Sequence, residues 1–206
     1  MHSASADELS PRESVIFERR ATALTQFDAR IPAIYRQPYE LPKQVADWIG
    51  GWSGNSLFLT GPIGVGKTHT AWHTCRRWLE AQYAPNMPWQ GTPIIKTYRS
   101  TALFDALRPD APDGEGRALV KTLQNVDLLF IDDLAAARPS SWTQERLFEL
   151  FDERYINLRP VIITCDVLPN QLTEVVGPRV ASRLAEMCRN SVVLLQGADR
   201  RKGAAA

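Results

Sequence analysis

The sequence has few of the features that mark secreted or membrane proteins. Its three cysteines, Cys75, Cys165 and Cys188, are scattered and odd in number and lack C-x-x-C spacing, which argues against a disulfide framework or a zinc site. No apolar run approaches the roughly 18 residues that a membrane span needs. Residues 1–14 also lack the apolar core of a secretory signal. We therefore expect a reduced, cytoplasmic protein with no membrane segment.

An excess of charge of one sign is missing as well. The 206 residues include 24 Lys and Arg against 23 Asp and Glu, which leaves a net charge of +1. This balance excludes a polybasic, histone-like protein and allows at most a local basic groove for nucleic acid. With 44% hydrophobic residues, the chain is expected to form one globular domain, with or without an appendage, around a substantial core.

Helix and strand patterns alternate through most of the chain. Residues 1–13 are mostly small and polar and are expected to be frayed, and residues 108–116 have the composition of a loop. Apolar spacing predicts helices at 14–30, 42–50, 68–83, 100–107, 117–123, 142–157, 168–176 and 179–188. Short apolar segments predict strands at 57–60, 92–98, 126–133, 161–164 and 191–195. Strands that alternate with helices form a parallel sheet covered on both faces.

A phosphate-binding loop is the most specific motif. Residues 61–68 match G-x-x-x-x-G-K-[ST] between an apolar strand and a helix. The glycines let backbone N–H groups point at phosphate oxygens, and the helix N-terminus adds partial positive charge. Lys67 is expected to reach the β- and γ-phosphates, and the Thr68 hydroxyl to ligate Mg²⁺. The predicted nucleotide-binding residues are Gly61, Pro62, Ile63, Gly64, Val65, Gly66, Lys67, Thr68 and His69.

An acidic pair, Asp132 and Asp133, ends the apolar strand predicted at 126–133. Ligands of parallel sheets bind at the carboxyl ends of the strands. Asp132 is expected to hold Mg²⁺, and Asp133 to orient or deprotonate a water that attacks the γ-phosphate. The alternative is a solvated pair of carboxylates at a strand end. A second carboxylate favours water as acceptor and hence hydrolysis, which argues against a P-loop kinase of a small molecule.

These motifs resemble the AAA+ ATPases, and within them the bacterial and phage helicase loaders of the DnaC/IstB-like branch. Residues 31–36 resemble the I-P-x-x-Y-R entry segment of that branch, 55–62 its approach to the loop, and 197–201 its closing G-x-x-R segment. The resemblance implies an α/β P-loop NTPase fold, a three-layer sandwich with a mostly parallel five-stranded sheet and no separate helical lid. It implies an ATPase domain at 31–202, a short tail at 203–206, and a tail and helix at 1–30 that either bind a partner or pack on the domain's own sheet.

The resemblance also implies roles for polar residues outside the loop. Arg183 corresponds to an arginine finger that completes a neighbouring subunit's site, with Arg179 as the fallback and a surface ion pair as the alternative. Thr164 and Asp166 are the candidates for sensor 1; the family usually has Asn where Asp166 stands, and Asp166 is equally suited to cap the following helix. Arg200 is the candidate for sensor 2.

The same resemblance suggests how the base, the DNA and the partners are bound. Ile34 and Tyr35 either line the adenine pocket or pack in the core. Loaders of this branch grip single-stranded DNA, and the candidate contacts here are Lys96, Arg99, Arg108 and Lys121. The expected cofactors are ATP and Mg²⁺, and the expected partners are a replicative DNA helicase and further copies of the chain, which meet through the ATP site. A transposition helper that regulates a transposase, and a nucleotide-dependent binding module with little turnover, remain alternatives.

Overall fold

A five-stranded sheet forms the centre of the molecule. The computed structural model describes residues 10–51, 54–84, 91–108 and 115–199. In the described chain the strands are β1 (Leu57–Thr60), β2 (Ile95–Arg99), β3 (Leu128–Asp132), β4 (Val161–Cys165) and β5 (Val192–Leu194). Their order is β2-β3-β4-β1-β5, and all four neighbouring pairs are parallel. This confirms the expected parallel sheet and brings the carboxyl ends of its strands to one edge.

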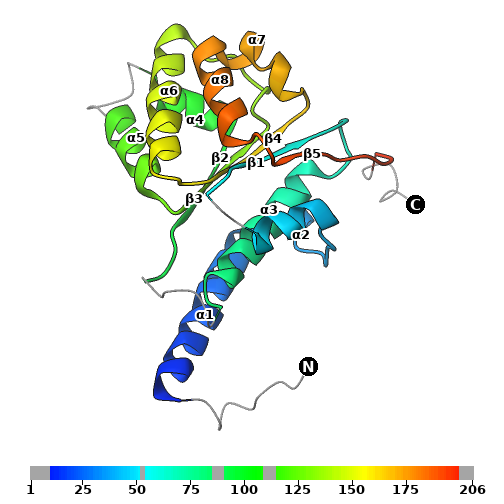
Figure 1. Ribbon diagram of the computed structural model, residues 1–206, viewed down its shortest axis with the longest axis vertical. Helices are drawn as coiled ribbons and strands as arrows, with labels where there is room; N and C mark the ends of the chain where they lie inside the picture. The colour runs from blue at the N-terminus through cyan, green and yellow to red at the C-terminus, as the bar shows by residue number, and fades with distance from the viewer. Residues whose placement is uncertain (1–9, 52–53, 85–90, 109–114, 200–206) are drawn as a thin grey trace.

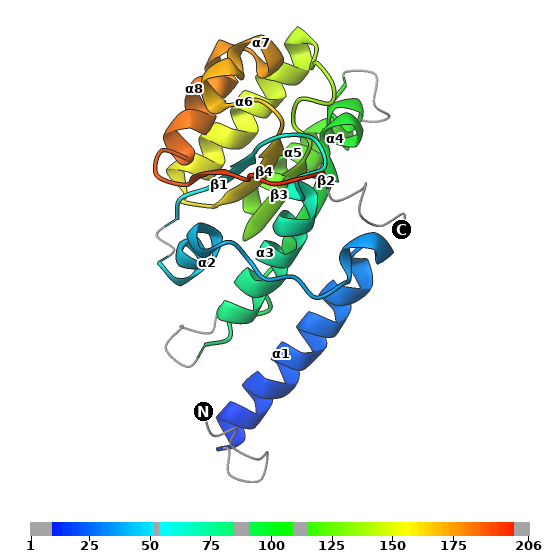
Figure 2. The same cartoon turned by 90° about the vertical axis from the view of Figure 1, so that its right-hand side faces the viewer.

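Helices cover both faces of this sheet, as Figures 1 and 2 show. On one face lie α1 (Pro11–Arg30), α2 (Lys43–Gly50) and α3 (Lys67–Ala81). On the other lie α4 (Ser100–Ala106), α5 (Glu115–Asn125), α6 (Ser141–Ile156), α7 (Thr173–Val176) and α8 (Pro178–Met187). Two short 3₁₀ helices, η2 (Ala33–Tyr35) and η4 (Pro169–Gln171), complete the described elements. None of the described helices is long and apolar enough to cross a membrane.

Strand β3 shows why the apolar runs form central strands. Leu129 and Ile131 pack into the cluster beneath α4–α8, whereas Leu128 and Phe130 pack into the cluster beneath α1–α3. Alternate side chains of a strand point to opposite faces. A strand between two helical layers therefore needs a continuous run of apolar residues. In β3 this run ends at Ile131, and the polar Asp132 is the last residue of the strand.

Helix α1 begins earlier than the sequence pattern predicts. The Ser10 side chain accepts a hydrogen bond from the Glu13 N–H, and the Glu13 carboxylate accepts one from the Ser10 N–H at 2.9 Å. This capping box, with Pro11 at the first helical position, starts the helix at Pro11. The expectation that residues 10–13 are frayed was therefore wrong, while residues 1–9 lie outside the described chain.

Other boundaries also shift for local reasons. The strand predicted at 92–98 is β2, which starts only at Ile95, because Pro93 has no N–H and the Ile94 N–H donates to the Asp127 side chain at 2.7 Å. The helix predicted at 168–176 is divided into η4 and α7. Helix α5 includes residues 115 and 116, which were assigned to a loop, and residues 109–114 of that loop lie outside the described chain.

Candidate functional site

The loop at 61–66 connects β1 to α3 at the carboxyl edge of the sheet. Gly66 caps the N-terminus of α3 in the left-handed conformation, with φ at 103° and ψ at 20°, and Gly64 has φ at 81°. Residues with a Cβ rarely adopt these angles. The Gly66 carbonyl accepts the Thr70 N–H at 2.8 Å and so begins the helical ladder. This strand, loop and helix form the arrangement that binds phosphate at a helix N-terminus.

Lys67, the first residue of α3, is hydrogen-bonded to the loop that precedes it. Its ammonium Nζ donates to the Gly61 carbonyl at 2.7 Å and to the Pro62 carbonyl at 3.0 Å. Both acceptors belong to the loop itself, so the positive charge already lies at its mouth. A phosphate oxygen is a stronger acceptor for an ammonium than a carbonyl and can take over these bonds.

The first turn of α3 and the ends of strands β3 and β4 place hydroxyl and carboxylate oxygens beside this loop. The Thr68 hydroxyl donates to Asp132 Oδ1 at 2.8 Å, and the Thr164 hydroxyl donates to the same oxygen at 2.7 Å. Thr164 lies on β4, between β3 and β1 in the sheet, and its hydroxyl also accepts the Asp133 N–H at 2.7 Å. The residues predicted from separate motifs thus form one hydrogen-bonded chain, in the order Thr68, Asp132, Thr164 and Asp133.

The donors around Asp132 fit a magnesium ion. Mg²⁺ prefers oxygen ligands and is usually held by one or two protein groups together with substrate phosphates and water. Asp132 and Thr68 are two such oxygen donors at hydrogen-bond distance from each other. Within the described residues, no group of three or more His, Cys, Asp or Glu side chains gathers as an all-protein metal site would need.

Asp133 lies in a strained turn. Its φ is 55°, which is uncommon for a residue with a side chain, and the residue is exposed at the sheet edge. The Ser100 hydroxyl donates to its carbonyl at 2.5 Å, and Thr164 accepts its N–H, so both backbone groups are fixed. Strain of this kind persists where the surroundings over-determine it. Sequence reasoning missed Ser100, whose only signal is its place directly after β2.

The sensor candidates differ in placement. Thr164 is 1% exposed and bonds to Asp132, whereas Asp166 is exposed beyond the end of β4. The structure therefore brings Thr164, and not Asp166, to the acidic pair. Arg200 lies outside the described residues.

Aromatic rings gather beside the first turns of α3. The Tyr39 ring lies 4.5 Å from the His69 ring and 5.5 Å from the His73 ring, and the Tyr35 ring lies 5.8 Å from His69. The Tyr39 hydroxyl bonds to the Thr70 hydroxyl at 2.8 Å. Sequence reasoning named Tyr35 and His69 but missed Tyr39 and His73, which lie outside any motif. Ile34 is 71% exposed, so it does not pack in the core of this chain.

Arg183 is bound within its own chain. Its guanidinium pairs with Asp152 of α6 at 2.6 Å and with Glu186, and it lies 4.3 Å from the centre of the Tyr155 ring. This is the ion pair that the alternative interpretation expected. Arg179, one turn earlier, is exposed and lies 3.9 Å from the centre of the Phe148 ring.

The basic candidates for DNA contacts lie toward one edge of the sheet. Lys96 and Arg99 are exposed on β2, the edge strand, and α4 contacts both β2 and α5. Arg108 follows α4 and pairs with Asp105 at 3.0 Å, and Lys121 is exposed on α5. These four cations are therefore accessible on this side of the described chain.

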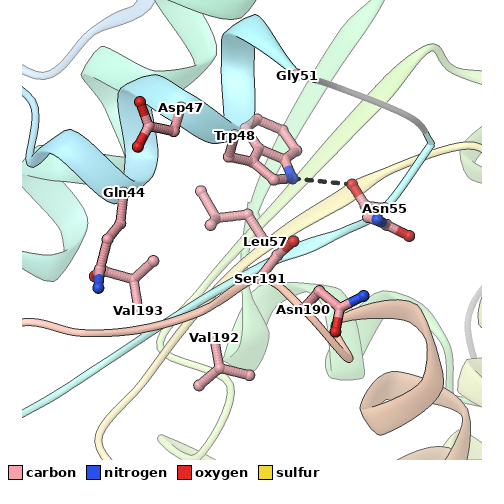
Figure 3. A pocket seen from close by; sticks show the side chains of 10 residues that line it. All are labelled: Gln44, Asp47, Trp48, Gly51, Asn55, Leu57, Asn190, Ser191, Val192 and Val193. Atoms are coloured by element: carbon pink, nitrogen blue, oxygen red, sulfur yellow. Dashed lines mark hydrogen bonds between the residues drawn. The ribbon is translucent and has the colours of Figure 1, made fainter.

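A cavity of about 390 Å³ lies at the amino ends of β1 and β5, against α2. Figure 3 shows Trp48 above it, with the indole N–H donating to the Asn55 carbonyl at 3.1 Å, and Leu57 and Ser191 on its wall. The loop and the acidic pair belong to the opposite, carboxyl edge. The cavity is therefore separate from the candidate site.

A model of the bacterial DnaA ATPase domain matches residues 25–188. The chain belongs to this family. Protein XkdC of the phage-like element PBSX from Bacillus subtilis (strain 168) is 26% identical over 175 residues, which cover 81% of this chain and 61% of XkdC. The chromosomal replication initiator protein DnaA of Latilactobacillus sakei subsp. sakei (strain 23K) is 28% identical over 130 residues, 63% of this chain and 26% of that protein. This DnaA-type ATPase domain therefore spans less than two thirds of either relative.

Solved structures share the fold of this DnaA-type domain. A crystal structure of the DnaC helicase loader is 24% identical, with a TM-score of 0.60 over 77% of this chain and 94% of that chain. A crystal structure of DnaI is 18% identical, with a TM-score of 0.56 over 96% of this chain and 90% of that chain. These findings confirm the predicted AAA+ ATPase class and its parallel sheet.

Proposed function

We propose that this chain binds ATP and Mg²⁺ at the 61–68 loop, hydrolyses the ATP, and uses the cycle to load a replicative helicase onto single-stranded DNA. The observation that carries the nucleotide site is the hydrogen-bonded chain from Thr68 through Asp132 and Thr164 to Asp133, next to the loop. These groups come from the first turn of α3 and from the ends of the two strands β3 and β4. Their convergence on one phosphate-binding loop suits γ-phosphate chemistry.

In this proposal each residue has a distinct task. Lys67 exchanges its carbonyl partners for the β- and γ-phosphates. Thr68 and Asp132 hold Mg²⁺, which supplies charge neutralisation on the phosphates when bound. Asp133 accepts a proton from the attacking water. Thr164 holds the carboxylate of Asp132, to which it donates, and the backbone of Asp133, whose N–H it accepts.

The active site is completed by a second copy of the chain. Arg183 acts in trans on the γ-phosphate of a neighbour, as an arginine finger. Within one chain it is held by Asp152 and Glu186, so assembly must exchange at least one of these partners for phosphate. Arg179, stacked on Phe148 of the same α6–α8 surface, is the second candidate for this role.

The replication context comes from the relatives. A solved neighbour is a DnaC helicase loader, and another is the initiator DnaA bound to AMPPCP and single-stranded DNA. Lys96, Arg99, Arg108 and Lys121 are the proposed phosphate contacts for DNA, and the protein acts in the cytoplasm. The N-terminal half of α1 is the proposed helicase contact, because Val15 and Phe17 are 46% and 54% exposed there.

Three measurements test the proposal together. ATPase activity is measured with and without single-stranded DNA, binding of a fluorescent ATP analogue is measured in parallel, and the tagged protein is tested for capture of a purified replicative helicase. Lys67→Ala is the control that must lose nucleotide binding.

Capture of a transposase instead of the helicase would favour the transposition helper, and a phosphorylated product without free phosphate would favour a small-molecule kinase. ATP binding without turnover would favour a nucleotide-dependent binding module.

A further inference from the structure

The segment after β5 lies against the phosphate loop. Residues 195–199, named here the C-terminal strap, begin where the Leu195 N–H donates to the Thr60 carbonyl at 2.8 Å. A Cβ added to Gly61 would lie 2.3 Å from the Leu195 carbonyl oxygen, and one added to Gly197 would lie 3.8 Å from a Val65 methyl. The strap therefore touches the loop at more than one residue.

The strap brings a carboxylate to the centre of the loop. A Cβ added to Gly64 would lie 1.9 Å from Asp199 Oδ1 and 2.3 Å from Asp199 Cγ. Gly64 has φ at 81°, so both the backbone angle and the space occupied by the carboxylate require glycine here. Asp199 thus lies directly on the loop that the proposed function assigns to phosphate.

The positive charge of the loop favours an anion at this position. The Lys67 ammonium lies against the Gly61 and Pro62 carbonyls, and α3 begins at Lys67, so the loop that Asp199 touches carries the positive charge of an ammonium and of a helix N-terminus. When a polyphosphate occupies the loop, the same carboxylate faces like charges at short range, which is unfavourable. Asp199 and the nucleotide phosphates therefore compete for the loop.

We propose that Asp199 is a displaceable anion of the phosphate loop, and that nucleotide phosphates drive it and the C-terminal strap off the loop. The proposal rests on the proposed function in one respect only, namely that the loop binds nucleotide phosphates. The position of the strap then depends on whether nucleotide phosphates occupy the 61–68 loop of the same chain. The strap also sets the affinity, because binding must first remove the resident carboxylate.

The first test compares nucleotide affinities. Asp199→Asn removes the charge at nearly constant shape, and Asp47→Asn makes the same change on the exposed surface of α2, where Asp47 pairs with Lys43. Asp199→Asn is expected to bind a fluorescent ATP analogue about tenfold more tightly than the wild type at low salt. The gain should be smaller for ADP, absent for adenosine, and reduced by added salt. Asp47→Asn should match the wild type.

The second test follows the strap itself. Cys75, Cys165 and Cys188 are all buried, so a thiol-reactive dye selects an introduced exposed cysteine. Ala198→Cys places that cysteine in the strap, and Ala46→Cys places it on α2 as a control. ATP is expected to lower the fluorescence anisotropy of a dye attached at Ala198→Cys, because the released strap moves more freely, and to leave that of a dye attached at Ala46→Cys unchanged. The ATP effect should disappear when Lys67→Ala is added to Ala198→Cys.

The outcomes separate this inference from the proposed function. ATP binding that survives Lys67→Ala would refute the nucleotide site itself. If Lys67→Ala loses binding but Asp199→Asn binds ATP no more tightly than the wild type, the nucleotide site stands and the displaceable anion is refuted. Weaker ATP binding by Asp199→Asn would also refute it, because the carboxylate would then be a nucleotide ligand.

Discussion

The two ends of strands β3 and β4 satisfy their polar groups in opposite ways. At the carboxyl ends, Asp132 and Thr164 share hydrogen bonds with side chains at the sheet edge, and those bonds can be exchanged when a ligand arrives. Just before the amino ends, one buried guanidinium, that of Arg154, serves three backbone carbonyls. The bonds at the carboxyl ends can be replaced by bonds to a ligand. The bonds of Arg154 hold the backbone at the amino ends of the same strands in place.

Arg154 is the most unusual charged residue of the described chain. It is fully buried on α6 and donates to the carbonyls of Leu123 at 2.5 Å, Val126 at 2.8 Å and Pro160 at 2.7 Å. Burial lowers the pKa of Arg154 to about 9, because removal from bulk solvent disfavours the charged form. Carbonyls at the C-terminal end of α5 compensate, because that end of a helix carries partial negative charge.

Substitution of the proposed catalytic groups should remove function without loss of the fold, and Arg183 of α8 provides the largest expected effect. Arg183→Ala is expected to bind ATP normally and to lose about 10³–10⁵-fold in hydrolysis rate, as trans fingers do. Single-turnover hydrolysis and binding of a fluorescent ATP analogue measure the two properties separately. The specific activity of the wild type should rise with protein concentration, because two chains must meet.

A mixing experiment decides whether Arg183 acts between chains. Arg183→Ala carries an intact loop and Lys67→Ala carries an intact finger, so the mixture should regain part of the activity that both lack alone. An inactive mixture, with wild-type specific activity independent of concentration, would place Arg183 outside the active site. The ion pair with Asp152 would then be its whole role.

The next largest effect is expected at Asp133. Asp133→Asn should retain ATP binding and reduce hydrolysis about 10²–10⁴-fold, because an amide does not accept the proton of the attacking water. Asp166→Asn is the matched control, since that carboxylate lies away from the hydrogen-bonded chain around Asp132. Hydrolysis by Asp133→Asn at the wild-type rate would assign the base to another group.

The amino end should show the reverse pattern, a loss of stability without loss of the site. Arg154→Met leaves three buried carbonyls without a donor and is expected to lower the free energy of unfolding by about 3 kcal/mol. Arg146→Met, on the same helix but only partly buried and paired with Glu149, should cost about 0.5 kcal/mol. Urea unfolding followed by circular dichroism measures both. Equal losses in the two variants would contradict the assigned role of Arg154.

The smallest effect concerns the surface contact between α1 and α3. Burial alone would raise the pKa of Glu80, but hydrogen bonds from Arg20 and Arg77 outweigh it and lower the pKa. A carboxyl with a lowered pKa contributes stability above its ordinary range near 4.5, and that contribution is lost as the pH falls through the lowered value. Glu80→Gln should therefore cost about 0.5 kcal/mol at pH 7 and nothing near pH 2. A pH-independent cost would mean that shape and not charge holds this contact.

The features that were predicted correctly from the sequence are those whose residues lie close together along the chain. The loop at 61–68 and the acidic pair are local motifs, and their placement at the carboxyl edge follows from the alternation of strands and helices. The role of Thr164 in this site was suggested by the family resemblance alone. Its contact with Asp132 depends on which strands are neighbours, and β4 lies between β3 and β1 only in the folded sheet.

The remaining features could not be read from spacing. Arg154 had no predicted role, because its partners are backbone carbonyls, two of them 28 and 31 residues distant, and any residue can supply these. Ser100 and Tyr39 were missed for the same reason, since each has its contact far along the chain. The capping box at Ser10 and Glu13, in contrast, is a local pattern and was available to inspection.

Helix α1 has a mechanical consequence. Its 20 residues form a rod about 30 Å long. Near its C-terminal end Asp28 is tied to Arg76 of α3 at 2.7 Å, and Arg20 is tied to Glu80 farther along the rod. Helix α3 starts at Lys67, at the mouth of the phosphate loop. A tilt of α3 would therefore also move α1, and the displacement would be greatest at the N-terminal end of α1, near Ser10.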